Sequence, residues 1–281
     1  MVALVGPTDL AVLVTGETGS GKERAARAVH TASGRQGLFV AVDCGAMPSE
    51  LVASTLFGHV KGAFTGAAGD RTGAFQQAAG GTLFLDEVGN LRPDDQAVLL
   101  RALQEGIVRR VGAEADERVD VRIVSATNID LVAAAEDGRF RLDLLHRLNE
   151  FPVRLPPLRD RADEIPRFVD GFLNEAAVRI GRRPSGVTDA AMDKLKSFKW
   201  PGNLRELRNV ITRAALMAGD GMVDVRHLLM DGDAEKIDEK AALESALTDA
   251  AGNKTQAALR LGVSRRTLYA MMERNGLSVN A

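Results

Sequence analysis

Short apolar runs alternate with helical patterns through the first half of the chain. Four of these runs are rich in Val, Leu and Phe, which favour strands, and they lie at residues 10–15, 38–43, 82–87 and 121–128. Nearly continuous apolar strands separated by helical stretches are typical of a parallel sheet with crossover helices. The pattern therefore predicts an α/β domain built on a parallel sheet.

The second half of the chain has a different pattern. The consecutive prolines at 156–157 exclude helix, and beyond them we expect the strands to stop and three or four amphipathic helices to follow. The clearest helix repeats apolar residues close to a 3.6-residue period, at Leu204, Leu207, Ile211, Ala214 and Ala218. We therefore place an α/β subdomain at 1–155 and a helical lid at 156–230.

The C-terminal part of the chain is predicted to be a separate small domain. The polar stretch at 231–240 predicts a linker or a frayed helix end, and residues 241–281 show a compact three-helix pattern. Within this pattern five Lys or Arg residues stand against three acidic ones, whereas the whole chain has 36 basic and 38 acidic residues. Any nucleic-acid surface must therefore be local.

The remaining composition excludes several classes of protein. A chain of 281 residues with 45% apolar and 26% charged side chains is enough for one large globular domain and a small second one. The single cysteine, Cys44, cannot form an internal disulfide, which fits a reducing cytosol. Because no apolar run approaches the roughly 18 residues of a membrane span and no signal peptide is apparent, we expect a cytoplasmic protein with no membrane partner.

A phosphate-binding loop is the first motif with specific chemistry. Residues 16–22, GETGSGK, fit the pattern G-x-x-x-x-G-K, with a predicted strand before them and a predicted helix after them. Such a loop turns backbone N–H groups toward phosphates, and Lys22 neutralises the outer phosphates; a purely structural glycine turn is the alternative. The candidate nucleotide-binding residues are Gly16, Glu17, Thr18, Gly19, Ser20, Gly21, Lys22 and Glu23.

An acidic motif at the end of a predicted strand complements this loop. Glu23 stands where a magnesium-binding hydroxyl is usual, so Mg²⁺ must depend more on water and on this second motif. Residues Asp86 and Glu87 end the apolar run at 82–87, at the sheet edge where open α/β sheets bind ligands. Asp86 is the candidate Mg²⁺ ligand, and Glu87 would orient or deprotonate the attacking water. Asn128, at the end of the next strand, is placed to sense the γ-phosphate.

One further motif carries a resemblance to a known family. The segment FGHVKGAFTGA at 57–67, together with the motifs above, resembles the sigma-54-dependent transcriptional activators of the AAA+ ATPase superfamily, and the match covers nearly the entire chain. In this family the hexapeptide forms the loop that touches sigma-54. The resemblance assigns that contact to Gly62, Ala63, Phe64, Thr65, Gly66 and Ala67. The glycines permit a sharp exposed loop with an apolar anchor at Phe64; a Phe buried in a hairpin is the alternative.

The resemblance also implies ATP as the nucleotide and a ring as the assembly. Residues 140–161 are similar to the arginine-finger segment of the family, which implies that Arg141 and Arg147 reach the γ-phosphate of a neighbouring subunit. In related enzymes such a finger contributes roughly 10³ to 10⁵ in rate. WPGNLRELRN at 200–209 is similar to the second sensor motif and implies that Arg205 reaches the nucleotide. A homo-oligomer, a hexameric ring with ATP sites at its interfaces, is the implied assembly.

The C-terminal segment at 253–277 resembles a Fis-type helix-turn-helix. Asn253 with Gln256 looks like a capping-box variant, and a small core is expected from Ala258, Leu261, Val263, Leu268 and Met272. The predicted DNA-binding residues are Thr255, Ser264, Arg265, Arg266, Thr267 and Tyr269. Upstream enhancer DNA is the implied partner, and a docking module without DNA affinity is the alternative.

Two features depart from the family pattern. Asp43 stands where the family commonly has an Asn that holds the water-activating Glu, and two carboxylates share a hydrogen bond only when one is protonated, so we expect weaker restraint of Glu87. Fifteen residues precede Gly16 and no regulatory domain stands before them. We therefore expect either a trimmed chain or control from expression level or from a regulatory protein acting in trans.

These observations together predict one function and leave two alternatives. The predicted protein is a transcriptional activator in which ATP hydrolysis by a ring remodels the closed complex of the sigma-54 RNA polymerase holoenzyme. One alternative is a DNA-binding regulator whose inert ATPase domain serves only as a scaffold for oligomerisation. The other is a AAA+ remodeller of a different protein client.

Overall fold

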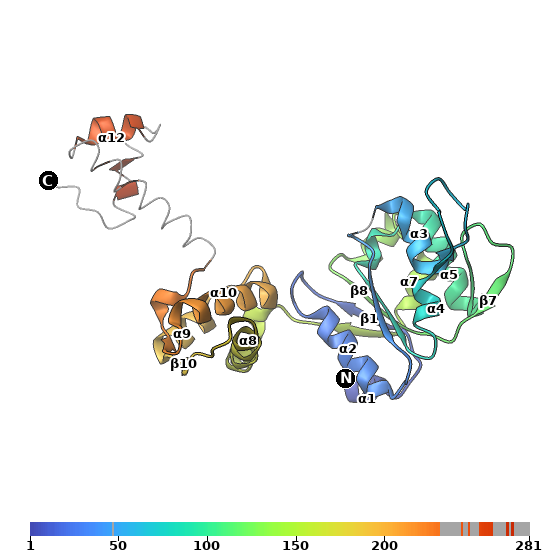
Figure 1. Cartoon of the computed structure of the whole chain (residues 1–281), viewed down its shortest axis with the longest axis horizontal. Helices are drawn as coiled ribbons and strands as arrows, with labels where there is room; N and C mark the ends of the chain where they lie inside the picture. The colour runs from blue at the N-terminus through green and yellow to red at the C-terminus, as the bar shows by residue number, and fades with distance from the viewer. Residues whose placement is uncertain are drawn as a thin grey trace. The chain divides into compact units, whose positions relative to one another are not determined.

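The computed structural model describes most of the chain, and these residues form two compact units (Figure 1). The described residues are 1–46, 48–230, 243, 247, 253–260, 268, 269, 271 and 272. The first unit comprises Met1–Ile165 with Phe198–Leu207, and the second comprises Pro166–Ser197 with Arg208–Ala281. The predicted linker at 231–240 and the predicted DNA contacts Ser264, Arg265, Arg266 and Thr267 lie outside the described residues.

A five-stranded parallel sheet lies at the centre of the first unit, with the strand order β2-β5-β8-β1-β9. Its strands are β1 (Val12–Thr15), β2 (Phe39–Asp43), β5 (Thr82–Asp86), β8 (Arg122–Thr127) and β9 (Phe151–Arg154). The first four are the predicted strands, which confirms the parallel α/β fold. Strand β9 was missed because it is short and contains Pro152, a residue that sheets tolerate at an edge position such as this one.

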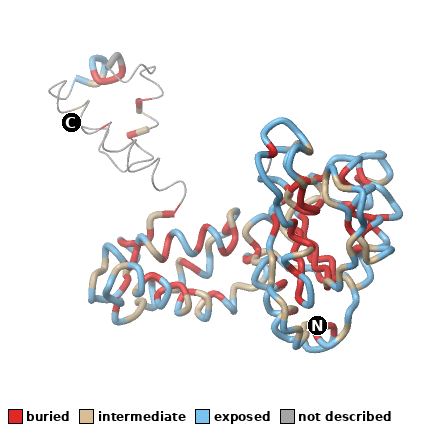
Figure 2. The backbone as a smooth tube through the Cα atoms, turned by 45° about the vertical axis from the view of Figure 1, so that its right-hand side comes forward, coloured by how far each residue is buried: buried red, intermediate tan, exposed pale blue. Residues whose placement is uncertain are grey.

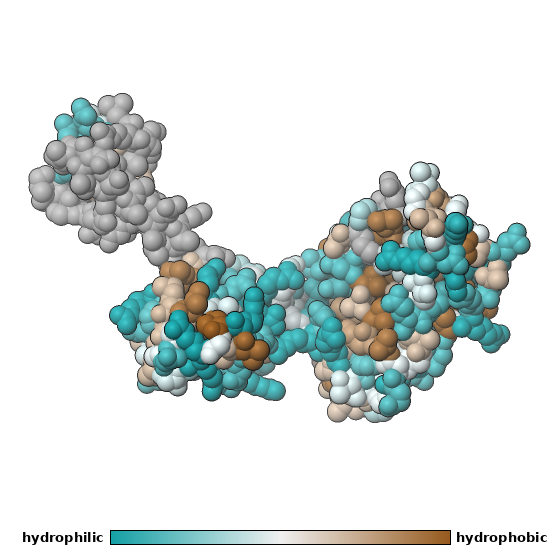
Figure 3. All heavy atoms as spheres, viewed as in Figure 1, coloured by the Kyte–Doolittle hydropathy of each residue, from teal (hydrophilic) through white to brown (hydrophobic). Residues whose placement is uncertain are grey.

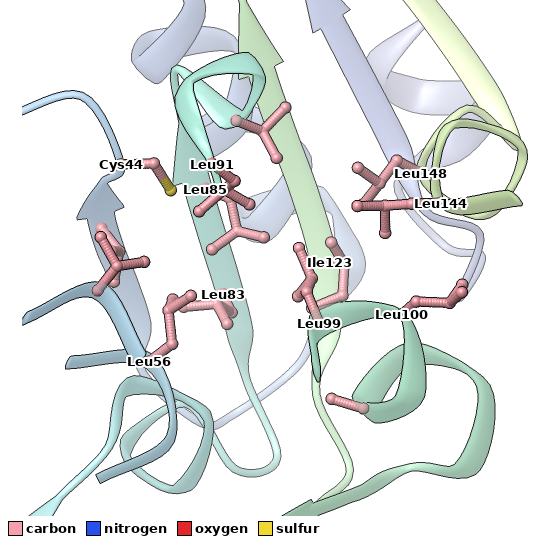
Figure 4. Close-up of a cluster of buried hydrophobic side chains, with 14 of the residues drawn as sticks. Cys44, Leu56, Leu83, Leu85, Leu91, Leu99, Leu100, Ile123, Leu144 and Leu148 are labelled. Atoms are coloured by element: carbon pink, nitrogen blue, oxygen red, sulfur yellow. The ribbon is translucent and has the colours of Figure 1, made fainter. Parts of the chain in front are cut away.

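Helices cover both faces of this sheet. One face carries α1 (Val2–Val5) and α2 (Lys22–Ser33), and the other carries five further helices. These five are α3 (Ser49–Phe57), α4 (Ala74–Gln77), α5 (Pro93–Glu105), α6 (Leu131–Glu136) and α7 (Leu142–Leu148). Because successive residues of a strand point to opposite faces, Leu83 and Leu85 enter the larger core while Phe84 enters the smaller one. Figure 4 shows part of the larger core, and Figure 2 shows the buried residues gathered in the interior of the unit.

Two short hairpins and two 3-10 helices complete the first unit. The hairpins pair β3 (Gly58–His59) with β4 (Arg71–Thr72) and β6 (Ile107–Arg109) with β7 (Asp116–Arg118). The 3-10 helices are η1 (Val88–Asn90) and η2 (Leu158–Glu164). A bridge between His59 and Val111 joins the two hairpins. The segment that resembles the sigma-54 contact therefore connects the two strands of the first hairpin, and the second hairpin lies beside it.

Helices dominate the described part of the second unit. They are α8 (Ile165–Ile180), α9 (Asp189–Ser197), the larger part of α10 (Asn203–Ala218), the 3-10 helix η3 (Val225–His227) and α12 (Lys254–Arg260). The predicted apolar face of α10 is buried at Leu207, Ile211 and Ala214. The expectation that strands stop after the prolines is wrong, because β10 (Gly186–Val187) and β11 (Met222–Val223) form a two-residue parallel pair. A pair this short is below the length at which a period-2 pattern is visible in a sequence.

The described C-terminal residues contain a small apolar cluster. Asn253 Oδ1 accepts hydrogen bonds from the N–H groups of Thr255 at 3.1 Å and Gln256 at 3.2 Å, as its predicted capping role requires. The cluster comprises Leu243, Ala257, Ala258, Leu268 and Met272. Three of these were predicted, whereas the predicted members Leu261 and Val263 lie outside the described residues.

Polar residues cover much of one face of the described chain. Figure 3 shows hydrophilic residues over most of the visible face, with hydrophobic residues in separate groups. Among the described residues no helix combines the length and the apolar character that crossing a membrane requires.

Candidate functional site

The loop at 16–22 connects β1 to α2 with the geometry of a phosphate loop. Gly19 and Gly21 adopt left-handed backbone angles, with φ of +76° and +101°, and Gly21 is the N-cap of α2. Glycine adopts these angles without the steric cost that a Cβ atom brings. The Ser20 hydroxyl is buried without a hydrogen-bond partner among the described residues. A buried unpaired hydroxyl beside a helix N-terminus fits a site that receives an anionic ligand.

Lys22 and Glu87 form a charged pair at the centre of this site. The Lys22 side chain is 6% exposed, and its ammonium group donates to Gly16 O at 3.1 Å and to Glu87 Oε1 at 3.3 Å. Glu87 has a φ of +51°, a strained angle for a residue with a side chain. Strain of this kind persists only where surrounding contacts hold it, and it is common at functional sites. The pair thus joins the phosphate loop to the end of β5.

Asn128 forms hydrogen bonds both to Glu87 and to the phosphate loop. Its backbone N–H donates to Glu87 Oε2 at 3.3 Å, and its side-chain Nδ2 donates to Thr18 Oγ1 at 3.0 Å. The ends of β5 and β8 therefore converge on the phosphate loop, as expected for neighbouring parallel strands. The structure brings together Lys22, Glu87 and Asn128 from three separate segments.

Asp86 lies at the same edge of the sheet and is suited to a cation. Burial and the neighbouring Glu87 charge raise the pKa of its carboxyl above the ordinary range, while Lys22 opposes the shift. A divalent cation next to Asp86 would relieve this repulsion. In the described part of the chain no three His, Cys, Asp or Glu side chains are grouped to hold a metal. Mg²⁺ at Asp86 would therefore need oxygen ligands from the nucleotide and water.

Asp43 forms no hydrogen bond with Glu87 in the described contacts. Its carboxylate accepts hydrogen bonds from the N–H groups of Gly45 at 2.9 Å and Ala46 at 3.1 Å, in the turn after β2. Glu87 is instead restrained by Lys22 and Asn128. Asp43 is aligned with Asp86 across β2 and β5, and its charge contributes to the raised pKa of Asp86.

Other predicted site residues lie apart from this cluster. The Glu23 carboxylate pairs with Arg27 at 2.7 Å on an exposed face of α2. Arg141 forms a two-bond ion pair with Asp143, at 3.0 and 2.7 Å. Arg147 donates to Leu103 O at 3.3 and 3.4 Å and lies 3.5 Å from Glu150. None of these described contacts involves the phosphate loop.

Three residues that the sequence analysis did not assign lie against the phosphate loop. Arg159 pairs with Glu17 through two hydrogen bonds, Arg161 donates to Ser20 O, and Asn203 donates to both Glu17 and Thr18. Arg205 follows Asn203 closely on α10, and its Cβ lies 3.2 Å from where a side chain on Gly19 would begin. The only sequence signal for these residues was their position within the segments at 140–161 and 200–209.

The predicted partner loop lies between β3 and β4. Gly62 and Gly66 have φ of +82° and +102°, and nothing lies within 4 Å of where their Cβ atoms would be. Gly62 N–H donates to Ala67 O at 2.9 Å, and Ala67 N–H donates to Phe64 O at 3.0 Å. The Phe64 ring is 38% exposed and packs edge-on against His59, with ring centroids 5.0 Å apart. The loop is thus internally bonded and carries an accessible aromatic side chain.

The second hairpin supports this loop. Val60 N–H donates to Val111 O at 3.1 Å. Gly112 has a φ of +80°, and a Cβ there would lie 2.7 Å from Ala63 Cβ. The close approach requires glycine at this position.

Three family models match consecutive parts of the chain. The sigma-54 interaction domain matches residues 1–154, the AAA+ ATPase lid domain matches residues 159–245, and the Fis family of bacterial regulatory proteins matches residues 238–274.

Curated relatives and solved structures agree with these matches. The transcriptional regulatory protein ZraR of Klebsiella oxytoca is 44% identical over 97% of this chain and 65% of its own length. The nitric oxide reductase transcription regulator NorR2 of Cupriavidus necator is 41% identical over 97% of this chain and 60% of its own length. The chain thus spans less than two thirds of the length of these relatives.

Among solved structures, NtrX from Brucella abortus is similar over almost the whole chain. Its complex with ADP has a TM-score of 0.74 at 32% identity and covers 98% of this chain and 67% of that one. Its complex with ATP has a TM-score of 0.74 at 33% identity and covers 98% of this chain and 66% of that one. The closed state of Hsp104, at 22% identity and a TM-score of 0.57 over 74% of this chain and 40% of that one, shares the fold.

Proposed function

The chain belongs to the family of sigma-54-dependent transcriptional activators, and we propose that it hydrolyses ATP to remodel the closed complex of sigma-54 RNA polymerase. The observation that carries this proposal is the convergence of Lys22, Glu87 and Asn128 on the phosphate loop. A cation for phosphates, a carboxylate for water and an amide donor are the groups that phosphoryl transfer to water requires.

The hydrogen bonds suggest how these residues act in turn. An arriving γ-phosphate competes with Glu87 for the buried Lys22 ammonium, because both are anions and the phosphate carries more charge. Once Lys22 turns to the phosphate, Glu87 Oε1 is released while the Asn128 N–H still holds Oε2. The free oxygen then accepts a proton from the water whose oxygen attacks the γ-phosphorus, while the bond to the β–γ bridging oxygen breaks and ADP leaves. Mg²⁺ held by Asp86 would neutralise charge on the phosphate oxygens.

We further propose that hydrolysis takes place in a homo-oligomeric ring, a hexamer. Arg141 and Arg147 serve as the residues that reach a neighbouring subunit's γ-phosphate. The Arg141 and Asp143 side chains are both about half exposed, and solvent-exposed pairs of this kind contribute little to stability. Exchanging Asp143 for a phosphate in a dry interface therefore costs little and gains a stronger charge-assisted contact.

The same proposal assigns the two macromolecular partners. The Phe64 loop contacts sigma-54 through its accessible ring, and loss of the γ-phosphate resets the loop. The helix-turn-helix binds upstream enhancer DNA, with Thr255 and Tyr269 among its contacts. A regulatory protein acting in trans remains part of the proposal for control.

ATP turnover per subunit, measured over a wide range of protein concentration, tests the enzymatic part. We expect turnover to rise steeply with concentration, because the arginines act across an interface. Glu87→Gln should abolish turnover and retain ATP binding, whereas Glu105→Gln, at an exposed position of α5, should behave as the wild type. Folded wild-type protein without turnover at any concentration would contradict the proposal and favour the inert scaffold.

Binding to purified sigma-54 in the presence of a transition-state mimic of ATP tests the partner. We expect Phe64→Ala to lose sigma-54 binding and to retain ATP turnover. Leu38→Ala, at a more exposed apolar position of the same unit, should retain both. Unchanged sigma-54 binding by Phe64→Ala would instead favour a different protein client.

A further inference from the structure

Residues far along the chain donate hydrogen bonds to the backbone carbonyl groups of the phosphate loop. Thr18 O accepts from Asn203 Nδ2 at 3.1 Å, Gly19 O accepts from Leu204 N–H at 2.9 Å, and Ser20 O accepts from Arg161 at 2.6 Å. Three successive carbonyls of one loop are therefore bound by two other segments of the same unit. We call Arg161, Asn203 and Leu204 the carbonyl clamp.

The clamp determines where the N–H groups of the loop point. In a trans peptide group the C=O and N–H bonds point in opposite directions. Binding the carbonyls of Thr18, Gly19 and Ser20 on one side therefore turns the N–H groups of the following residues to the other side. The Ser20 N–H donates to Glu17 O at 3.1 Å, whereas those of Gly19 and Gly21 donate no hydrogen bond among the described residues. Two donors are thus preset for an anion.

Asn203 connects the parts of this clamp. Its side chain is fully buried, with Oδ1 accepting from Leu158 N–H at 2.8 Å and Nδ2 donating to Thr18 O and Glu17 Oε2, both at 3.1 Å. One acceptor and two donors at one position are what a primary amide supplies and a carboxylate does not. The φ of +52° also favours asparagine over most other side chains.

A neighbouring residue, Arg159, neutralises a charge that the loop itself carries. Arg159 binds both oxygens of Glu17, at 3.0 and 2.7 Å. These bonds, with that from Asn203, lower the pKa of Glu17 to about 2, so its carboxylate is charged at neutral pH. An uncompensated carboxylate next to the phosphates would repel them.

We propose that Asn203 is a positioning residue for ATP: through the carbonyl clamp it presets the N–H groups of the phosphate loop, and with Arg159 it screens the Glu17 carboxylate from the phosphates. This inference rests on the proposed binding of ATP at the loop. Asn203 touches neither Glu87 nor Asn128 in the described contacts. It therefore acts on the affinity for the nucleotide more than on the chemical step.

Asn203→Asp in the full-length chain tests the proposal, because it preserves shape and the acceptor for Leu158 but replaces two donated bonds by repulsion from Glu17 and Thr18 O. We expect the Kd for ATP and the KM to rise about tenfold, equivalent to about 1.4 kcal/mol, with kcat reduced less than threefold. Asn174→Asp, at an exposed position of α8, is the matched control and should leave both values unchanged.

A compensating change separates positioning from a general structural defect. Glu17→Gln in the Asn203→Asp background restores a donor opposite the new carboxylate, and we expect it to bring the Kd to within about threefold of the wild type. Folding of each variant is checked by a urea titration. If Asn203→Asp does not fold, Arg159→Met replaces it, because that side chain is half exposed; it should weaken ATP binding, and Glu17→Gln should restore it.

The outcomes distinguish this inference from the proposed function. A folded wild-type chain that does not bind ATP would overturn the proposed function. A wild type that binds ATP, with an Asn203→Asp variant that binds it within twofold as tightly, would overturn the clamp alone. Failure of Glu17→Gln to restore binding in either background would likewise overturn it.

Discussion

Replacement of Gly19 by alanine tests how closely the phosphate loop packs against residues 202–204. A Cβ atom on Gly19 would lie far inside contact distance of the Gly202 carbonyl oxygen, and 3.2 Å from Arg205 Cβ. Carbon and oxygen atoms settle at about 3.5 Å, so one segment has to retreat by roughly 1 Å. The φ of +76° at Gly19 adds a separate cost for any residue with a side chain.

The size of the effect follows from the contacts that such a retreat breaks. Leu204 N–H donates to Gly19 O at 2.9 Å and Asn203 Nδ2 donates to Thr18 O at 3.1 Å; a shift of roughly 1 Å takes both beyond hydrogen-bond length. Each lost bond costs about 0.5–1.5 kcal/mol, and the left-handed angle costs about 1–2 kcal/mol. We therefore expect Gly19→Ala to lower the free energy of unfolding by about 2–5 kcal/mol.

Gly34 provides a matched control for the backbone part of this cost. Its φ is +69°, and nothing lies within 4 Å of where its Cβ would be, so Gly34→Ala should cost only about 1–2 kcal/mol. Urea unfolding followed by tryptophan fluorescence measures both variants, because the chain has one tryptophan and this residue, Trp200, is fully buried next to the contact. Equal losses in the two variants would refute the close packing of the loop against residues 202–204.

Three further predictions concern other parts of the first unit. Gly112→Ala should displace Ala63, whose Cβ would be 2.7 Å away, and so weaken binding to sigma-54 while ATP turnover stays within twofold. Arg122→Met should lower the free energy of unfolding in urea by about 1–3 kcal/mol, because it leaves Gly6 O without its donor, whereas Val5 O keeps its hydrogen bonds from Thr8. The lowered pKa of Glu17 stabilises the fold above its unfolded value of about 4.3, and this contribution is lost as the pH falls toward about 2. Glu17→Gln should therefore flatten the fall in urea midpoint across that acidic range.

Controls for these predictions use comparable positions. Gly138 has a φ of +73° with open space around it, so Gly138→Ala should leave sigma-54 binding unchanged; equal binding by Gly112→Ala would contradict the contact with Ala63. Arg118 is exposed, and Arg118→Met should cost little, so a similar loss in both arginine variants would count against the buried role of Arg122. An acid titration of Glu17→Gln that follows the wild type would show that Glu17 is not stabilised as described.

Several features of this protein follow from local sequence. The four predicted strands, the glycine spacing at 16–22 and the acidic end of β5 all depend on residues within a few positions of one another. Parallel strands present their carboxyl ends at one edge of a sheet, so the meeting of Lys22, Glu87 and Asn128 was also predictable. The partner loop was assigned through the resemblance of residues 62–67 to the hexapeptide of the family.

Other features depended on how the chain folds back on itself. The bond from Asn203 to Glu17 joins residues 186 positions apart, and no local pattern indicates which distant side chains meet the loop carbonyls. Exposed residues such as Glu23 and Arg141 pair with near neighbours, because long charged side chains on the surface take the partners within reach. The strands, the phosphate loop and its acidic partner could be located without a structure, since they follow from periodicity and spacing. The residues that hold that loop in shape could be found only in the folded chain, because hydrogen bonds between distant segments depend on the final positions of their backbones.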